Sequence, residues 1–278
     1  MKQDPLDARE LLKAYGIVPK KQLGQNFVIQ RSALEQIITA ASLTEQELIL
    51  EIGAGLGALT LELAGSGHRV VAVEYDKRLV PILRSIMAAQ SNVSIIHGDI
   101  LQLDLAEILD QRKYIVVANI PYHITSAVIR RLMESPLRAK RVILTIQREV
   151  AERIVAGPGD LSLLALSVQV FGLPRIHSHI SSAAFYPQPK VESSVLRIDM
   201  LPESMITKGE LDLFFRIAKA GFSQKRKQLR NALAGGLHLS PREIEEIMQG
   251  VDINPTRRAQ ELDLDDWQRL CMGFRGKL

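Results

Sequence analysis

The chain has 278 residues, of which 46% are hydrophobic and 24% charged; these values are ordinary for globular proteins and exclude a disordered or fibrous chain. This length suits one large domain, or a larger domain joined to a smaller one. The single cysteine, Cys271, excludes an internal disulfide and indicates a reducing compartment.

The N-terminus mixes charges of both signs and lacks the apolar core of a secretory signal. No uninterrupted apolar run reaches the length of about 18 residues that a membrane-spanning helix needs. We therefore expect a cytoplasmic protein without contact to a membrane.

Between residues 48 and 147, short apolar runs alternate with helical patterns. The runs are rich in β-branched residues, as in parallel strands that are buried on both faces. Strands are expected at Leu48–Ile52, Val70–Val73, Val93–Ile96, Ile115–Ala118 and Val142–Ile146. Helices are expected at Leu59–Ala64, Leu79–Met87 and Ser126–Met133, the last two with Asp76 and Thr125 as N-caps. The alternation predicts a doubly wound, Rossmann-like α/β sheet.

Residues 148–172 have a helical pattern, and two strand-like stretches follow at Arg175–Ser181 and Ser194–Asp199. We expect these two stretches to form a hairpin that extends the sheet. After Met200 the pattern becomes helical with short loops, and Trp267 is expected in the core of this part. The sequence therefore predicts two domains, residues 1–203 with the sheet and a small all-helical domain of residues 204–278.

A glycine turn, with Gly53, Gly55 and Gly57, follows the first expected strand and opens a helix. Glycine allows positive φ and a close approach of backbone to ligand, and the helix start offers free N–H groups. The spacing fits an NAD site, because Gly53, Gly55 and Ala58 match G-x-G-x-x-A. It also fits a site for S-adenosyl-L-methionine, which favours the G-x-G-x-G form.

Two acidic residues lie at the next two strand ends. Glu74 ends the second strand, where its carboxylate can accept hydrogen bonds from both hydroxyls of a ribose. Asp99 follows the third strand and can accept a hydrogen bond from an adenine amino group. Ligands bind at the carboxyl edge of such sheets, so features at three successive strand ends predict one cofactor site.

The tetrapeptide Asn119-Ile120-Pro121-Tyr122 follows the fourth strand. It resembles the motif of methyltransferases that act on amino groups of planar rings, which favours S-adenosyl-L-methionine over NAD. The Asn119 side-chain oxygen and the Ile120 carbonyl can accept the two N–H bonds of an adenine amine and localise its lone pair. Pro121 biases Ile120 toward extended backbone, and Tyr122 offers a face for a stacked base. An NAD-dependent dehydrogenase, which gives no reason for this motif, remains a distant alternative.

With these motifs in place, the chain resembles the ribosomal RNA adenine N6,N6-dimethyltransferases from about Lys20 to about Trp267, most closely the bacterial small-subunit branch. The resemblance is carried by Leu23–Val28, Glu51–Gly57, Glu74, Gly98–Asp99, Asn119–Tyr122, Phe185–Ser193, Phe222–Asn231 and Asn254–Ala259. It implies an S-adenosyl-L-methionine-dependent enzyme that dimethylates N6 of two adjacent adenosines in the 3′-terminal hairpin loop of 16S rRNA. The substrate would be the small ribosomal subunit, with a further role in its biogenesis.

The resemblance also implies roles for single residues. It places the cofactor against residues of the N-terminal arm, which is the segment before the first expected strand of the sheet, and of the strand ends: Asn26, Val28, Gly53, Gly55, Glu74, Asp99 and Asn119. The target adenine would be held by Asn119, Ile120, Pro121 and Tyr122, with Phe185 stacking on the face opposite Tyr122. The family commonly has Leu or Ile at the position of Val28, and a backbone contact there would survive the change. The six histidines are scattered without metal-ligand spacing, so no metal site is expected.

Net charge alone does not name a partner, because the parts before and after residue 200 each carry +2, from 22 basic against 20 acidic residues and 13 against 11. The local distribution is more informative, since six basic residues and no acid lie between residues 216 and 230. Such clusters suit RNA phosphates, although a solvated helix face is the alternative explanation. The expected phosphate contacts are Arg216, Lys219, Lys225, Arg226, Lys227 and Arg230.

Two alternatives stay open beside a monomeric small-subunit enzyme. The 23S rRNA dimethyltransferases that confer macrolide resistance share the cofactor motifs, but Ser223–Asn231 resembles the small-subunit group better. A ribosome assembly factor would bind immature small subunits without any need for methyl transfer.

Overall fold

The computed structural model describes residues 7–44 and 47–278, and contacts group them into two compact units. The first unit holds the described residues up to Ala151 together with Pro174–Met200. The second holds Glu152–Leu173 and Leu201–Leu278. The expected boundary near residue 203 lies close to the last junction, whereas residues 152–173 group with the C-terminal helices rather than with the sheet.

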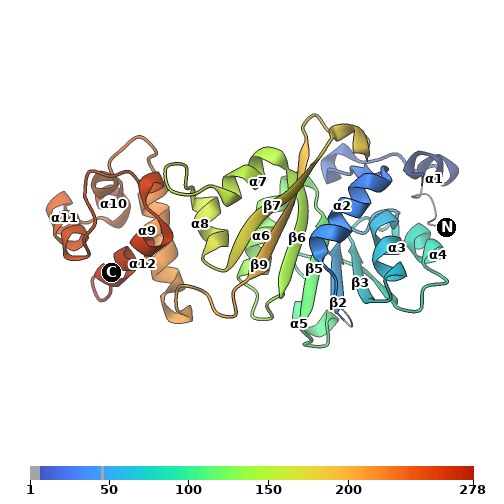
Figure 1. Cartoon of the computed structure of the whole chain (residues 1–278), viewed down its shortest axis with the longest axis horizontal. Helices are drawn as coiled ribbons and strands as arrows, with labels where there is room; N and C mark the ends of the chain where they lie inside the picture. The colour runs from blue at the N-terminus through green and yellow to red at the C-terminus, as the bar shows by residue number, and fades with distance from the viewer. Residues whose placement is uncertain (1–6, 45–46) are drawn as a thin grey trace. The chain divides into compact units, whose positions relative to one another are not determined.

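The first unit is built on a seven-stranded sheet with the order β4-β3-β2-β5-β6-β9-β7 (Figure 1). Its five parallel strands are those predicted: β2 (Leu48–Ile52), β3 (Arg69–Glu74), β4 (Val93–His97), β5 (Tyr114–Asn119) and β6 (Arg141–Gln147). The chain order reverses at β2, which lies between β3 and β5. A sheet of this kind binds ligands at the carboxyl ends of the strands beside that reversal, and the predicted doubly wound fold is confirmed.

The expected hairpin is also present. Strand β9 (Ser193–Met200) pairs antiparallel with β6, and β7 (Gly172–Ile180) forms the edge of the sheet. A second sheet was not predicted: β1 (Phe27–Val28) pairs antiparallel with β8 (Phe185–Tyr186). Two-residue strands are too short to show a hydrophobic period, so the sequence carries no signal for this pairing.

Helices α2 (Arg31–Ala41), α3 (Ala58–Gly65) and α4 (Val80–Ile86) contribute to the core on one face of the sheet, and α2 and α3 lie in front of the strands in Figure 1. That core combines helix side chains with alternate strand positions, among them Leu34, Ile37, Leu63, Leu83, Ile49, Val117 and Ile143. Each such side chain contributes roughly 1.5–3 kcal/mol by its burial. The other helices that begin in the first unit are α1 (Ala8–Ala14), α5 (Leu105–Ile108), α6 (Thr125–Met133) and α7 (Arg148–Val155).

Both predicted N-caps are wrong. Helix α4 begins at Val80, with Leu79 as its N-cap. Asp76 lies one turn earlier, and its carboxylate accepts from the Arg78 backbone N–H. Helix α6 begins at Thr125 itself, with Ile124 as the N-cap.

The second unit is helical, with α8 (Leu163–Gln169), α9 (Leu211–Phe222), α10 (Leu229–Leu237), α11 (Pro241–Gly250) and α12 (Leu264–Gly273). Trp267 is fully buried and stacks on Phe222, with 5.2 Å between ring centroids, which confirms its predicted core position. Helices α9 and α10 cross closely at Gly236, where an added Cβ would lie 2.6 Å from the Cβ of Ala220. Within residues 7–44 and 47–278, no helix has the length and apolar character needed to cross a bilayer.

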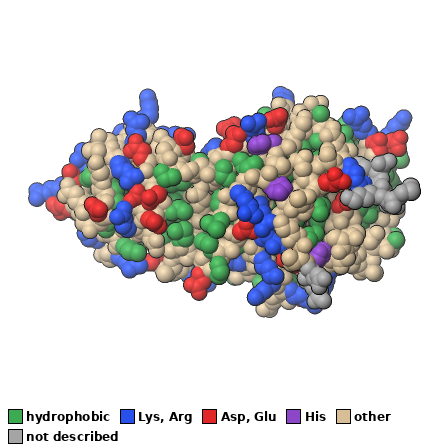
Figure 2. All heavy atoms as spheres, in the orientation of Figure 1, with side chains coloured by type: hydrophobic (Ala, Val, Ile, Leu, Met, Phe, Trp, Pro, Cys, Tyr) green, Lys and Arg blue, Asp and Glu red, His purple; other side chains and the backbone are tan. Residues whose placement is uncertain are grey.

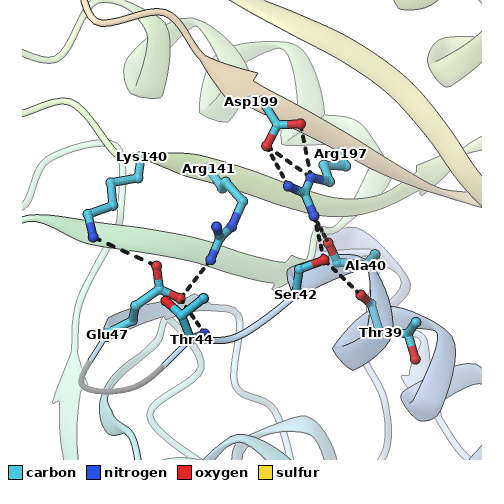
Figure 3. A network of polar contacts seen from close by, with 9 residues as sticks. All are labelled: Thr39, Ala40, Ser42, Thr44, Glu47, Lys140, Arg141, Arg197 and Asp199. Carbon is cyan, nitrogen blue, oxygen red and sulfur yellow. Dashed lines mark hydrogen bonds and ion pairs between the residues drawn. The ribbon is translucent and has the colours of Figure 1, made fainter.

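A polar network at the amino ends of the strands ties α2 to the sheet (Figure 3). The buried Glu47 carboxylate accepts from the Arg141 guanidinium over 2.6 Å. Arg197 binds Asp199 over 2.7 Å and also donates to the Ala40 carbonyl over 3.0 Å. Arg197 thus fixes the end of α2 against β9, and the Glu47–Arg141 pair fixes the segment before β2 against β6.

Candidate active site

A cavity of about 290 Å³ lies at the carboxyl ends of the parallel strands. Its walls include all seven residues predicted to bind a cofactor: Asn26, Val28, Gly53, Gly55, Glu74, Asp99 and Asn119. Pro121 and Tyr122 line it as well, whereas Phe185 does not. The fold therefore brings the arm, the glycine turn and three further strand ends together around one space.

The glycine turn keeps its backbone close to the cavity. Gly55 has φ of +59°, and a Cβ added there would lie 3.1 Å from the Phe27 ring of the arm. The Gly53 N–H donates to the Val73 carbonyl over 2.9 Å, which ties the turn to β3. Any larger residue at Gly55 would have to displace the arm.

Glu74 is held in place by two backbone groups. One carboxylate oxygen accepts from the Gly55 N–H and the other from the Asp76 N–H, each over 2.7 Å. Burial raises the pKa of Glu74, while the hydrogen bonds from Asp76 and Gly55 act in the opposite direction. Because each carboxylate oxygen has two lone pairs, both can accept one more hydrogen bond from a ligand.

A second carboxyl group, that of Glu51, lines the cavity and was given no role from the sequence. It is fully buried, and its Oε2 has no hydrogen-bond partner among the described residues. Burial raises the pKa of Glu51 to about 8, and the negative charge of Glu74 acts in the same direction. Its place directly before the glycine turn is the sequence signal that could have identified it.

Asp99, which was predicted to accept from an adenine amino group, lines the cavity together with Tyr75. Asp99 is half-buried and accepts from the Leu101 N–H over 2.9 Å, which fixes its carboxylate at the strand end. Tyr75 lines the cavity although 59% of its surface is exposed. This exposed ring follows Glu74 directly and was not identified from the sequence.

The N-terminal arm meets the fourth strand end at Asn119. The Asn119 side-chain Nδ2 donates to the Asn26 carbonyl over 2.9 Å. Gly24 of the arm, with φ of +60°, lies so close to His123 and Pro121 that an added Cβ would be 3.0 Å from the His123 ring. The arm therefore packs directly on the Asn119–Tyr122 motif.

Tyr122 is half-buried, and its hydroxyl lies 2.8 Å from the hydroxyl of Ser193 at the start of β9. Burial raises the pKa of Tyr122, so the phenol stays protonated at neutral pH. Ser193 belongs to a segment that carries the family resemblance, but its contact with Tyr122 was not predicted.

Phe185 lies away from the cavity wall. It is 2% exposed and belongs to the same core cluster as Val28, its partner in the β1–β8 pair. Stacking of Phe185 on a target base stays a prediction, and it requires this ring to leave the core.

The six predicted phosphate contacts lie in the second unit, on α9, on α10 and between them. Five of them are exposed: Arg216, Lys219, Lys225, Arg226 and Lys227. Arg230 is half-buried and donates to Glu245 over 2.8 Å, so its charge is already paired within the unit. The exposed group is therefore the part of the cluster that is available to a polyanion.

The cavity suits the chemistry of S-adenosyl-L-methionine. The Oε2 atom of Glu51, which has no hydrogen-bond partner among the described residues, is available to a ligand in the cavity, and the positive φ at Gly55 leaves room for a ligand to approach the backbone. Glu74 and Asp99 supply acceptors of the kind that ribose hydroxyls and an adenine amine require.

Residues 18–272 match the family model described as ribosomal RNA adenine dimethylase. A protein of Dehalococcoides mccartyi (strain CBDB1) named ribosomal RNA small subunit methyltransferase A is 42% identical over 272 residues, covering 97% of this chain and 93% of that protein. The protein of the same name from Alkaliphilus oremlandii is 36% identical and covers 99% and 98%.

Two solved structures share the fold. A dimethyladenosine transferase from Plasmodium falciparum has a TM-score of 0.77 at 24% identity, covering 90% of this chain and 98% of that one. The 23S rRNA methyltransferase ErmE has a TM-score of 0.72 at 23% identity, covering 90% and 100%. The match of the family model over nearly the whole length, together with these relatives, shows that the chain belongs to the ribosomal RNA adenine dimethylase family of S-adenosyl-L-methionine-dependent methyltransferases.

Proposed function

We propose that this protein dimethylates N6 of two adjacent adenosines in the 3′-terminal hairpin loop of 16S rRNA and thereby contributes to small-subunit biogenesis. The observation that carries the proposal is the convergence of Asn119, Glu74 and Asp99 on one cavity, beside a motif suited to an adenine amine. Its similarity to the small-subunit methyltransferases over almost the full chain favours 16S rRNA over 23S rRNA as substrate.

Residues 1–203 form the catalytic domain in this proposal. The backbone around Gly53 and Gly55, the carboxylates of Glu74 and Asp99, and the arm residues Asn26 and Val28 would hold the cofactor. When bound, S-adenosyl-L-methionine supplies an electrophilic methyl group on a sulfonium sulfur. The buried Glu51 carboxyl would lie on the wall of this site, and in its ionised form it would place a negative charge there.

The target adenine would bind at the motif that follows β5. Asn119 Oδ1 and the Ile120 carbonyl accept the two N6–H bonds, which makes the nitrogen pyramidal and exposes its lone pair. The Ile120 N–H donates to the Thr145 carbonyl over 3.3 Å, so β6 holds this backbone in place. Tyr122 offers its ring to the base, and its hydroxyl is fixed by Ser193. Proximity and fixed dipoles provide the rate enhancement in this arrangement, without a strong base.

An adenine inside a duplex cannot reach such a cavity, so the target has to be unpaired or flipped out of its stack. A hairpin loop supplies unpaired bases at low cost. Loops of ribosomal RNA in the cytoplasm are therefore suitable substrates, and we propose that the enzyme acts there as a monomer.

Residues 204–278 would bind RNA phosphates through the exposed cations between Arg216 and Lys227. On the face seen in Figure 2, blue and red side chains are interspersed over most of the surface. The segment between residues 216 and 230, on and between α9 and α10, differs from this mixed pattern because its sequence contains six basic residues and no acid. Arg230, which pairs with Glu245, would contribute only if that ion pair opened.

Methyl transfer from labelled S-adenosyl-L-methionine to purified ribosomal subunits tests the proposal. Small subunits that lack the modification should accept the label, and mass mapping should find dimethyladenosine at two adjacent positions of 16S rRNA. Label on 23S rRNA alone would move the protein to the macrolide-resistance branch. Rescue of subunit assembly by an Asn119→Ala variant without transfer would show that a binding role is separable from catalysis.

A further inference from the structure

The arm sets the orientation of the Asn119 amide. Asn26 presents a backbone carbonyl, which can only accept, so the group 2.9 Å away has to be the NH2 end of Asn119. The oxygen end, Oδ1, is thereby directed away from the Asn26 carbonyl. Residues 7–44 and 47–278 offer Oδ1 no hydrogen-bond donor, so it is free to accept from a ligand.

The opposite orientation would be unproductive. It would place Oδ1 against the Asn26 carbonyl, where two acceptors repel each other. It would also turn the NH2 group toward the amine of an adenine, where two donors meet. One hydrogen bond from the arm therefore decides whether Asn119 can accept from the target.

The arm is held by a chain of polar contacts that ends in the turn before α4. Gln25 uses both ends of its amide: Oε1 accepts from the Lys20 N–H over 2.7 Å, and Nε2 donates to Asp76 over 2.9 Å. The Asp76 carboxylate is in turn bound by the Arg78 guanidinium, with contacts of 2.6 and 3.0 Å. Arg78 also donates to the Val18 carbonyl over 3.3 Å, so it contacts the arm twice, directly and through Asp76.

These contacts stay in place over the physiological pH range. Asp76 is 5% exposed, and the Arg78 guanidinium lowers its pKa to about 2, so it remains an ionised acceptor at every physiological pH. The Asp76 N–H donates to Glu74, which links the same turn to the carboxylate proposed to bind the ribose. Neither Asp76 nor Arg78 lines the cavity, so neither can touch a cofactor or base bound there.

We propose that Gln25, Asp76 and Arg78 are positioning residues that hold the arm so that the Asn26 carbonyl turns Asn119 Oδ1 toward the target amine. The inference rests on the proposed function, because it takes Asn119 as the acceptor of the adenine N6–H. It adds residues that control methyl transfer, and two of them, Asp76 and Arg78, do not line the cavity.

The first test is kinetic and uses the Arg78→Ala variant at saturating S-adenosyl-L-methionine, so that cofactor affinity does not enter the rate. We expect kcat to fall roughly three- to tenfold, the loss expected from one misdirected hydrogen bond. The matched control is Lys77→Ala, which removes an exposed cation at the adjacent position and should leave kcat unchanged.

The second test asks whether the effect passes through Asn119. Aspartate at this position has acceptors at both ends and no orientation to set, and it has no donor for the Asn26 carbonyl, so the hydrogen bond from the arm is already absent. Arg78→Ala should therefore cost little in an Asn119→Asp background. An equal fold-loss in both backgrounds would mean that the arm acts only as a cover, and would overturn the proposal.

The third test does not depend on activity. The side-chain amide resonance of Asn119, assigned by its absence from the Asn119→Asp spectrum, should shift or broaden in Arg78→Ala but not in Lys77→Ala. Gln25→Met, which keeps the side-chain length and removes both amide contacts, should give the same change. An unchanged Asn119 resonance in both variants contradicts the proposal, even if Asn119→Asp is inactive. A changed resonance in a protein that methylates no RNA would support the positioning role and reject the proposed function.

Discussion

The hydroxyl groups of Tyr122 and Ser193 lie 2.8 Å apart, and this contact joins the motif after β5 to the first residue of β9. Ser193 is fully buried, whereas Tyr122 faces the cavity with part of its ring. The position of the aromatic face thus depends on a strand that is distant in sequence.

Ser193→Ala should therefore weaken RNA methylation and the stability of the fold by similar amounts. One buried hydrogen bond is worth about 1 kcal/mol, so we expect a modest fall in melting temperature and a roughly fivefold fall in kcat/KM for RNA. Tyr122→Phe removes the other hydroxyl and should cost a similar amount. The double variant should lose no more than either single one; additive losses would show that the two hydroxyls act independently.

Glu51→Gln should change how stability depends on pH. In the unfolded chain Glu51 ionises near its ordinary value of 4.5, whereas in the folded protein it keeps its proton up to about 8. The folded state binds more protons between these values, so the free energy of unfolding falls as pH rises through this window. Because Gln does not titrate, the free energy of unfolding of the variant should rise relative to that of the wild type from pH 5 upward, by on the order of 4 kcal/mol at pH 8. Urea unfolding of both proteins at pH 5, 6.5 and 8 measures this, and a difference that does not vary with pH would contradict it.

Glu74→Gln should weaken cofactor binding without unfolding the protein. Both Glu74 oxygens accept from backbone N–H groups, and glutamine would place an NH2 donor against one of them. A lost charged hydrogen bond is worth roughly 1.5–3 kcal/mol, so we expect at least a tenfold rise in the Kd for S-adenosyl-L-methionine, measured by calorimetry. Glu62→Gln on the outer part of α3 changes the same chemical group outside the cavity and should leave the Kd unchanged.

Replacement of Lys225, Arg226 and Lys227 by alanine should reduce the salt dependence of small-subunit binding. The slope of log K against log salt is negative, and each lost phosphate contact should reduce its magnitude by about 0.7–0.9. Cofactor affinity should not change, because these residues do not line the cavity. Arg242→Ala removes an exposed cation of α11 that pairs with Glu246, and it serves as the control for nonspecific loss of charge. An unchanged slope in the triple variant would place the RNA contacts elsewhere.

Glu47→Ala should destabilise the protein more than any single surface substitution. It leaves the Arg141 guanidinium, 15% exposed, without its carboxylate partner, and breaking a buried ion pair costs about 3–5 kcal/mol. Arg242→Ala breaks an exposed pair worth less than about 1 kcal/mol and provides the comparison. The melting temperature of Glu47→Ala should lie clearly below that of Arg242→Ala. Equal melting temperatures would mean that the Glu47 pair is screened like a surface pair.

The elements that could be predicted are those with a period or a fixed turn. The buried strand Leu48–Ile52 appears with the bounds expected from its run of apolar residues, and the glycine turn follows it directly. Glu74, Asp99 and Asn119 could be identified because strand ends of a parallel sheet meet at one edge.

The features that escaped prediction depend on contacts between distant segments. The Asp76 side chain had the sequence context of an N-cap, but Gln25 and Arg78 engage it instead. The β1–β8 pair and the Ser193 contact join residues whose local sequence carries no sign of a partner. Phe185 likewise pairs with Val28 and belongs to the same core cluster, and its local sequence carries no sign of this place.

The ion pairs around Glu47 and the cavity occupy opposite ends of the same strands. Strand β2, with five residues from Leu48 to Ile52, separates them by about 17 Å, which exceeds the screening length of about 8 Å at physiological salt. The distance alone weakens the effect that a charge change at the amino ends has on the cofactor or the target base. We therefore expect substitutions at Glu47, Arg141 and Arg197 to change the free energy of unfolding while the methylation chemistry at the other end of the strands stays nearly constant.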